Sequence, residues 1–302
     1  MINNPSVKHH FLPRHYLNGF TNEKGRFSVY DKSTGKIFES SPADTFFEKN
    51  SNTVTYPTGE SSDFLEGLYT HVENESWSSF NKIRDSSKDT KIELLDKMSV
   101  YSFLLFLHWR LPANISSVET LSNVAFNEKN VLNYFSIKNK DGSRAPDKII
   151  HTISQSSAFK KTLKLLIPFA PFFKDINWHD DVLRWRFLYP DNGKSQYVVG
   201  DVPLITAGEH DNDPVQCLKE FVFPISGKIL LVNTNPPIKQ GFPPELVIEF
   251  NMTVFEKSQR FVACSNRDWL EVMVMYYNSY KINGRNHAII PNFFSGLESG
   301  VF

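Results

Sequence analysis

A run of histidine, arginine and aromatic residues stands close to the start of the chain and reads His10-Phe11-Leu12-Pro13-Arg14-His15-Tyr16-Leu17. His10 could act as a general base or a metal ligand, and the guanidinium of Arg14 could bind phosphoryl oxygens. Pro13 fixes one backbone dihedral, so we expect this segment to dock against the rest of the fold. The alternative role is structural, with the ring of His10 bound to a backbone carbonyl to anchor the segment.

Further charged side chains follow apolar segments of the chain that could hold them in place. Glu66 and Glu73 lie seven residues apart, so they would share one face of a helix. His108 and Arg110 close a strongly apolar stretch, and Asp201 follows a β-like one. Strand ends often present catalytic carboxylates, which makes Asp201 the leading acidic candidate.

These residue types favour hydrolysis of a phosphate ester. His10, Glu73 and Asp201 offer nitrogen and oxygen ligands for Mg²⁺ or Mn²⁺, and the metal would activate water. Arg14 and Arg110 would then hold the phosphoryl oxygens. The predicted pocket is lined by His10, Arg14, His108, Arg110 and Asp201, but no two of them have the spacing of a compact ligand pair.

Each charged residue also has a structural alternative. Glu66 could lie on a solvated helix face or pair with Lys82 or Arg84. Arg110 could satisfy the last carbonyls of its own helix, where a cation is favoured by the helix dipole. Asp201 could cap a turn through backbone N–H groups. The sequence alone leaves both interpretations open for these residues.

Basic and aromatic residues alternate in Arg184-Trp185-Arg186-Phe187. In a strand over Val182 to Tyr189, Arg184 and Arg186 would project from one face, as a basic stripe that could follow a nucleic-acid backbone. The alternative is that both arginines form surface ion pairs with nearby carboxylates, which are those of Asp180, Asp181 and Asp191.

Six motifs in order carry a family resemblance. His10 to Leu17 fit the pattern His-x-x-Pro-x-x-Tyr-Leu, and the later motifs are Val29-Tyr30-Asp31, Glu66 with Glu73, His108-Trp109-Arg110-Leu111-Pro112, Gly200-Asp201-Val202-Pro203 and Phe223-Pro224-Ile225-Ser226. Over nearly its whole length the chain resembles the bacterial and phage family catalogued as domain of unknown function 4238. The chain departs from the family pattern at Leu107, where the family has Gln, and at Gly200, where it has Ser. The resemblance implies antiphage defence or mobile elements as the setting, with a nuclease as the usual suggestion.

The composition is that of an ordinary globular protein. The chain has 302 residues, of which 40% are hydrophobic, so it can bury a substantial core. Its 33 basic and 33 acidic residues balance, and any contact with nucleic acid must therefore come from a local patch. Cys217 and Cys264 are far apart and lack the basic setting of a reactive thiol, which favours a reducing compartment, the cytoplasm, and no cysteine nucleophile. Neither a signal segment nor a membrane-spanning run is expected.

The pattern predicts a hairpin over Arg26 to Glu39 and then a helix from Phe64 to about Arg84, with Ser61, Ser62 and Asp63 before it as cap candidates. A central, buried helix is predicted over Lys91 to Arg110. Further helices are expected over Val118 to Tyr134 and Lys148 to Leu166. After Pro168 the pattern becomes β-like and predicts an antiparallel sheet from four segments: Val182 to Tyr189, Tyr197 to Val199, Glu220 to Phe223 and Lys228 to Val232. The last predicted elements are a helix over Pro244 to Ser258, a strand over Arg260 to Cys264 and a helix over Asp268 to Tyr280 capped by Asn266.

The sequence therefore predicts an α+β fold, with a helical middle packed against a β-rich second half. We expect one compact domain over residues 1–302, with subdomains 1–140 and 141–302 as the alternative. The predicted function is a cytoplasmic defence- or toxin-type enzyme, a metal-dependent nuclease or nucleotide hydrolase. The alternative is a sensor or adaptor without catalysis, which binds a phage component or a partner protein of a defence system.

Overall fold

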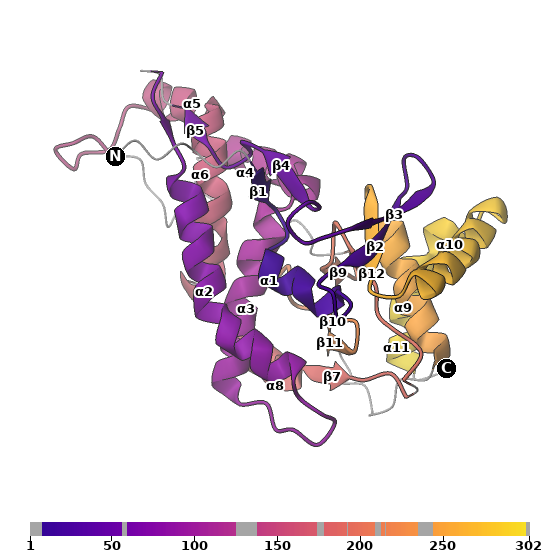
Figure 1. The fold of residues 1–302 in the computed structure, drawn as a ribbon. Helices are drawn as coiled ribbons and strands as arrows, with labels where there is room; N and C mark the ends of the chain where they lie inside the picture. Colours follow the sequence, from indigo (N-terminus) through magenta and orange to yellow (C-terminus); the bar gives the residue numbers. More distant parts are fainter. Residues whose placement is uncertain are drawn as a thin grey trace.

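The computed structural model describes residues 8–55, 59–124, 138–173, 178–191, 193–208, 213–214, 216–234 and 244–299. Its architecture is α+β, with helices α2, α3 and α6 on one side, helices α9 to α11 on the other and antiparallel strands between them (Figure 1). Two apolar cores fill this arrangement. One lies around α2, α3 and the amino-terminal segment, and the other around α9 to α11.

The helical side confirms the two strongest periodic predictions. Helix α2 covers Phe64–Arg84, and helix α3 covers Leu94–Arg110. From Val100 onward nearly every side chain of α3 is buried, because α3 packs against α2 on one side and against the sheets and α6 on others. Apolar residues around most of its circumference are typical of such a central helix.

The next predicted helices are shorter than expected. Helix α4 covers Ile115–Val124, and residues 125–134 of that prediction lie outside the described residues. The prediction for Lys148 to Leu166 divides into α5, Asp147–Gln155, and α6, Ser157–Leu166. Ser156 separates them, because its extended backbone ends α5 and its hydroxyl accepts the N–H of Phe159 to begin α6.

The strands form two four-stranded antiparallel sheets rather than the one expected. The predicted hairpin is present as β2, Phe27–Asp31, and β3, Lys36–Ser40. It continues through β12, Phe261–Cys264, to β8, Val199–Gly200. The other sheet has the order β7-β11-β10-β9, with β7 at Arg186–Leu188, β11 at Ile229–Asn233, β10 at Phe221–Ser226 and β9 at Ile205–Thr206.

The predicted strand over Val182 to Tyr189 is wrong in its first half. Residues Trp178–Arg184 form helix α8, whose first turn contains Asp180 and Asp181, and only Arg186–Leu188 is a strand. Acidic side chains near the start of a helix stabilise its dipole, and this local effect outweighs the β propensity that follows. Arg184 and Arg186 consequently do not project from one face of a strand, and the predicted basic stripe is not formed.

The carboxy-terminal helices cover the second core. Helix α9 covers Pro244–Lys257 and helix α10 covers Arg267–Ile282, and the side chain of Asn266 accepts the N–H of Trp269 as the predicted cap. Helix α11, Ile289–Ser299, was not predicted. Remaining short elements are α7, Ala170–Phe173, and a β5–β6 pair at Val54–Thr55 and Ser61–Ser62. None of the described helices combines the length and apolar character needed to cross a bilayer.

The amino-terminal segment lies between the helical side and the sheets (Figure 1). Strand β1, Lys8–His10, pairs with β4, Phe47–Lys49, and helix α1 covers Arg14–Leu17. The ring of Tyr16 stacks on Phe223 of β10 and also contacts Phe80 of α2 and Phe103 of α3. Its hydroxyl donates to the carbonyl of Pro224 at 2.8 Å. One residue of this segment thus joins both sides of the molecule, as Pro13 led us to expect.

The backbone of Gly200 lies so close to the end of α9 that a side chain there would be crowded. A Cβ built there would stand 1.9 Å from Oγ of Ser258 and 3.0 Å from Val254. We expect Gly200→Ala to lower the free energy of unfolding by about 1–3 kcal/mol through overpacking. Gly67→Ala is the control, because open space surrounds Gly67 and the change should be neutral or stabilising.

Urea unfolding of Gly200→Ala, Ser258→Ala and the double variant measures this strain directly. The double variant should be less destabilised than the sum of the two single variants, because removal of Oγ relieves the closest contact. Additive losses would show that the contact between β8 and the end of α9 does not restrict residue 200.

Candidate functional site

The guanidinium of Arg110 is the centre of the polar network that the structure forms around the first motif. Its side chain is only 4% exposed. Nη1 donates to Oε1 of Glu73 at 2.5 Å, Nε donates to the carbonyl of Phe11 at 3.1 Å, and Nη2 donates to the carbonyl of His10. The plane of the guanidinium also lies over the ring of Tyr69 at 4.9 Å. Arg110 therefore anchors the amino-terminal segment and does not cap its own helix.

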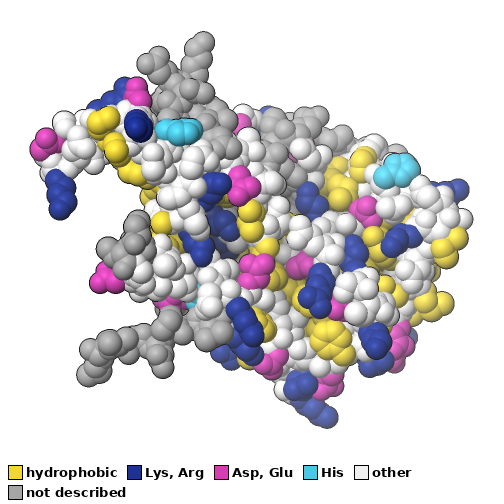
Figure 2. Space-filling model, turned by 90° about the horizontal axis from the view of Figure 1, so that it is seen from above, with side chains coloured by type: hydrophobic (Ala, Val, Ile, Leu, Met, Phe, Trp, Pro, Cys, Tyr) yellow, Lys and Arg dark blue, Asp and Glu magenta, His cyan; other side chains and the backbone are white. Residues whose placement is uncertain are grey.

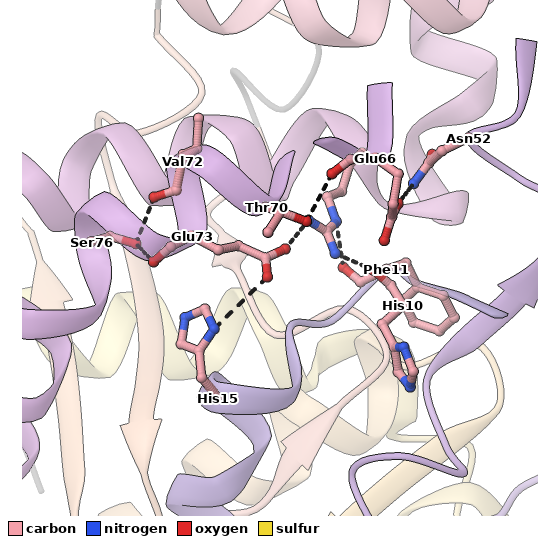
Figure 3. A network of polar contacts seen from close by, with 10 residues as sticks. His10, Phe11, His15, Asn52, Glu66, Thr70, Val72, Glu73 and Ser76 are labelled. Carbon is pink, nitrogen blue, oxygen red and sulfur yellow. Dashed lines mark hydrogen bonds and ion pairs between the residues drawn. The ribbon is translucent and has the colours of Figure 1, made fainter. Parts of the chain in front are cut away.

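Glu73 points inward from α2 and contacts two basic side chains. Figure 3 shows its carboxylate directed toward the ring of His15. The other oxygen of that carboxylate accepts from Nη1 of Arg110. Oε2 lies 3.8 Å from Nδ1 of His15. Burial, helped by the charges of Arg110 and Arg84, lowers the pKa of His15 to about 4, so this ring is neutral at pH 7. Aromatic rings of Trp77, Phe80 and Phe103 enclose it.

His15 was not singled out as a site residue from sequence. The available signal was its position five residues after His10 and directly before the buried Tyr16 and Leu17, but that pattern does not show which face contacts Glu73. Nε2 of His15 is buried and has no hydrogen-bond partner. The ring of His15 forms a polar cluster with Glu73 and Arg110.

His10 lies close to this cluster, but its ring faces elsewhere. Nε2 lies 3.3 Å from the carbonyl of Ala43, and the ring packs against Phe47 at 5.6 Å between centroids. Burial lowers the pKa of His10, and Arg14 and Arg110 add to this effect against the hydrogen bond to Ala43. Only the backbone carbonyl of His10 contacts Arg110, so the ring has the anchoring role considered as the structural alternative.

Three other residues of the first, third and fourth motifs take separate positions. Arg14 is exposed at the start of α1. His108 is buried in α3 beside the ring of Trp109. Glu66 accepts a hydrogen bond from Nδ2 of Asn52 at 2.7 Å rather than pairing with a basic residue of its own helix (Figure 3).

Asp201 holds together a turn from a distant part of the chain. Its two carboxylate oxygens accept the backbone N–H groups of Gln259, Arg260 and Phe261 at 2.6 to 2.9 Å. Burial raises the pKa of the Asp201 carboxyl, although these three N–H groups and Lys32 oppose the shift. Asp201 thus caps the turn between α9 and β12. This is the capping role of the structural alternative, although the capped turn lies far from Asp201 in the sequence.

The two arginines of the predicted nucleic-acid site have local partners. Arg184 pairs with Asp181, one of the three carboxylates considered for it. Nη1 of Arg186 donates to the carbonyls of Arg184 and Trp185, each at 3.2 Å. The third carboxylate considered, Asp191, pairs with Lys88.

Three motif segments meet at one cavity of about 190 Å³, which we call the motif cavity. The first motif contributes Phe11, the motif after α3 contributes Pro112 with Ala113, and the motif after β8 contributes Asp201. The remaining lining residues are Phe47, Glu48, Gln259, Arg260 and Phe261. The guanidinium of Arg260 lies 4.5 Å from the Phe261 ring centre and pairs with Asp31. Arg110 borders this site because it holds the backbone of Phe11.

The structure therefore brings some predicted site residues together and leaves others apart. Arg110, Glu73 and the backbone of His10 form one network, and Asp201 shares the motif cavity with the neighbouring Phe11. Within the described residues, no three His, Cys, Asp or Glu side chains are grouped so as to hold a metal ion. The requirement for Mg²⁺ or Mn²⁺ stays a prediction.

The family model described as Protein of unknown function (DUF4238) matches residues 8–268, and the chain belongs to that family. No curated protein and no solved structure matches the chain.

The Arg110–Glu73 pair should contribute strongly to stability. Arg110→Met leaves an inward-facing carboxylate and two carbonyls without their donor, and we expect a loss of about 3–5 kcal/mol in the free energy of unfolding. Glu73→Gln is the matched partner, and the double variant should lose less than the sum. Equilibrium urea unfolding measures all three. A single Arg110→Met variant as stable as the parent would contradict the anchoring role.

The pH dependence of stability should report His15. The unfolded chain protonates it below its ordinary pKa of 6.5, whereas the folded protein keeps it neutral down to about pH 4. The free energy of unfolding should therefore fall as the pH drops from 6.5 to 4. His15→Gln should remove about 2–3 kcal/mol of that fall. His71→Gln, at an exposed position of α2, is the control and should keep the parent's profile.

Proposed function

We propose that this chain is a nucleotide-binding sensor in which the motif cavity receives a nucleobase. The observation that carries the proposal is the convergence of three separate motifs on one cavity with aromatic walls. Phe11, Phe47 and Phe261 come from three distant parts of the chain, and all three rings line it. Aromatic side chains stack on bases of every kind, which makes them the usual platform for nucleobases.

The size and polar groups of the cavity suit a single planar ring. A volume of about 190 Å³ is below the roughly 300–1,000 Å³ of sites for drug-sized ligands. Glu48, Gln259 and Arg260 are exposed polar side chains on its wall, and they can hydrogen-bond the edge of a base. Aromatic faces with polar groups at the margin match the two kinds of contact that a flipped or unpaired base makes.

Recognition is favoured over hydrolysis because the groups proposed for catalysis have structural partners. Both carboxylate oxygens of Asp201 accept backbone N–H groups, and the His10 ring contacts Ala43 and Phe47. Three donor atoms of Arg110 are used on Glu73 and the amino-terminal backbone. A general base needs a free acceptor within reach of the proton that it removes.

Titration calorimetry with the common nucleosides and nucleoside monophosphates tests the proposal. We expect saturable binding of at least one base, and Phe47→Ala should weaken it about 5- to 150-fold, the range expected for one stacking contact. Tyr276→Ala is the control, because Tyr276 is an aromatic residue of α10 that is 46% exposed and lies outside the cavity lining. Absence of binding, or equal loss in both variants, would overturn the proposal.

A parallel incubation with RNA, DNA and nucleotides separates recognition from hydrolysis. Cleavage that needs Mg²⁺ or Mn²⁺ and that disappears in Asp201→Ala would support the nuclease or nucleotide hydrolase instead of the sensor. The defence setting and the cytoplasmic location remain predictions from the family resemblance and from the cysteine content.

A further inference from the structure

A second cavity of about 370 Å³ lies beside the motif cavity, and we call it the lysine groove. Its walls come from β4 and the turn after it, from α4, and from α5 and α6. The lining residues are Glu48, Ser51, Ile115, Val118, Glu119, Gln155, Ser157, Lys160, Lys161 and Lys164. Three of them are lysines of a single helix, α6.

Two parts of the chain connect the linings of the two cavities. Glu48 of β4 lines both of them. The segment after α3 passes from one to the other, since Pro112 and Ala113 line the motif cavity while Ile115 and Val118 line the lysine groove. A ligand whose ring occupies the first cavity therefore has its substituents directed along a wall that leads to the second.

Lys164 is the lysine of the groove whose charge has no partner among the described residues. It is half-buried and makes no hydrogen bond or ion pair with any described residue. Burial lowers its pKa, and the nearby charge of Glu48 opposes that shift. A half-buried ammonium group without an acceptor is costly, and an anion in the groove would remove that cost.

The other two lysines of the groove make a weak ion pair or a single hydrogen bond with the protein. Nζ of Lys160 is 3.5 Å from Glu119, which is 51% exposed. Nζ of Lys161 donates to the backbone carbonyl of Thr53 at 2.6 Å, which leaves two of its three donors for a ligand. Figure 2 looks onto this end of the molecule, and Lys and Arg side chains gather there beside Asp and Glu side chains.

We propose that the lysine groove binds the phosphate groups of the nucleotide whose base occupies the motif cavity. This inference rests on the proposed function and names the part of the ligand that the groove recognises. Ammonium groups on one helix face can follow a chain of phosphates, each as a point charge with three donors. The combined volume of the two cavities falls in the range of sites for whole small ligands.

Glu48 allows a test in which the affinity for phosphate should rise rather than fall. Its carboxylate lines the boundary between the cavities and would repel an incoming phosphate. Glu48→Gln removes one negative charge without changing the size of the side chain, so it should strengthen phosphate binding. Lys164→Gln removes the unpaired cation and should weaken it.

The experiment compares a nucleoside, its monophosphate, its diphosphate and inorganic pyrophosphate by titration calorimetry on the full chain. We expect affinity to rise from nucleoside to diphosphate, and pyrophosphate alone to bind. Lys164→Gln should reduce diphosphate and pyrophosphate affinity at least tenfold and leave nucleoside affinity unchanged, and Glu48→Gln should increase both phosphate affinities. Lys24→Gln is the matched control for net charge, because Lys24 is exposed in the turn before β2.

The results distinguish the failure of this inference from that of the proposed function. Pyrophosphate binding that depends on Lys164 without any nucleoside binding would overturn the base site and retain the phosphate groove. Nucleoside binding that phosphates do not strengthen, or equal losses in Lys164→Gln and Lys24→Gln, would overturn the groove. A glutamate-rich peptide that binds through Lys164 while pyrophosphate does not would assign the groove to an acidic protein partner and overturn the phosphate inference. Thermal unfolding of each variant verifies that it is folded.

Discussion

The contact between the guanidinium of Arg110 and the backbone carbonyls of His10 and Phe11 determines where the other polar groups lie. Arg110 sits at the end of a buried helix, and its donors reach back across about a hundred residues of sequence. That contact fixes the backbone of His10 and Phe11 to the end of α3, beside the position that the Tyr16 ring takes between α2, α3 and β10. Glu73 supplies the counter-charge of the guanidinium, because a buried cation needs both a counter-charge and hydrogen-bond acceptors.

The motif cavity depends on this anchor. Phe11 lines the cavity with its side chain while its carbonyl accepts from Arg110, and Pro112 follows the same arginine on the other side. Asp201 fixes the opposite wall through the turn that carries Arg260 and Phe261. Residues that look catalytic in the sequence thus act mainly by positioning backbone, and the surfaces that they position are aromatic.

Sequence reasoning predicted the elements whose signal is local. The hairpin around Gly35, helix α3 and the Asn266 cap depend on turn chemistry, apolar periodicity and one hydrogen bond, and all three are confirmed. The strand proposed over Val182 to Tyr189 was wrong, because Asp180 and Asp181 favour a helix start that β propensity does not take into account. Tertiary context overrides propensity in such short segments.

The contacts of the predicted site residues could not be predicted from the sequence. Arg110, Glu73, His10 and Asp201 were chosen for their residue types and positions, yet their partners lie 33 to 100 residues away and follow from how helices and turns pack. His15 was missed, and so was the cavity that the basic run Lys160-Lys161-Thr162-Leu163-Lys164 lines. The three lysines lie within five residues of sequence, but only the positions of β4, α4 and α5 make them part of a cavity wall.

The hydrogen bond from the Tyr16 hydroxyl to Pro224 spans 208 residues. During synthesis the tyrosine leaves the ribosome long before its acceptor exists, so the aromatic ring that joins the two sides cannot reach its final place until β10 has been made. Long-range closure of this kind slows folding and delays the exclusion of water from the interior. The first motif is therefore made long before its partner in β10, and it is among the last described parts of the fold to reach its final position.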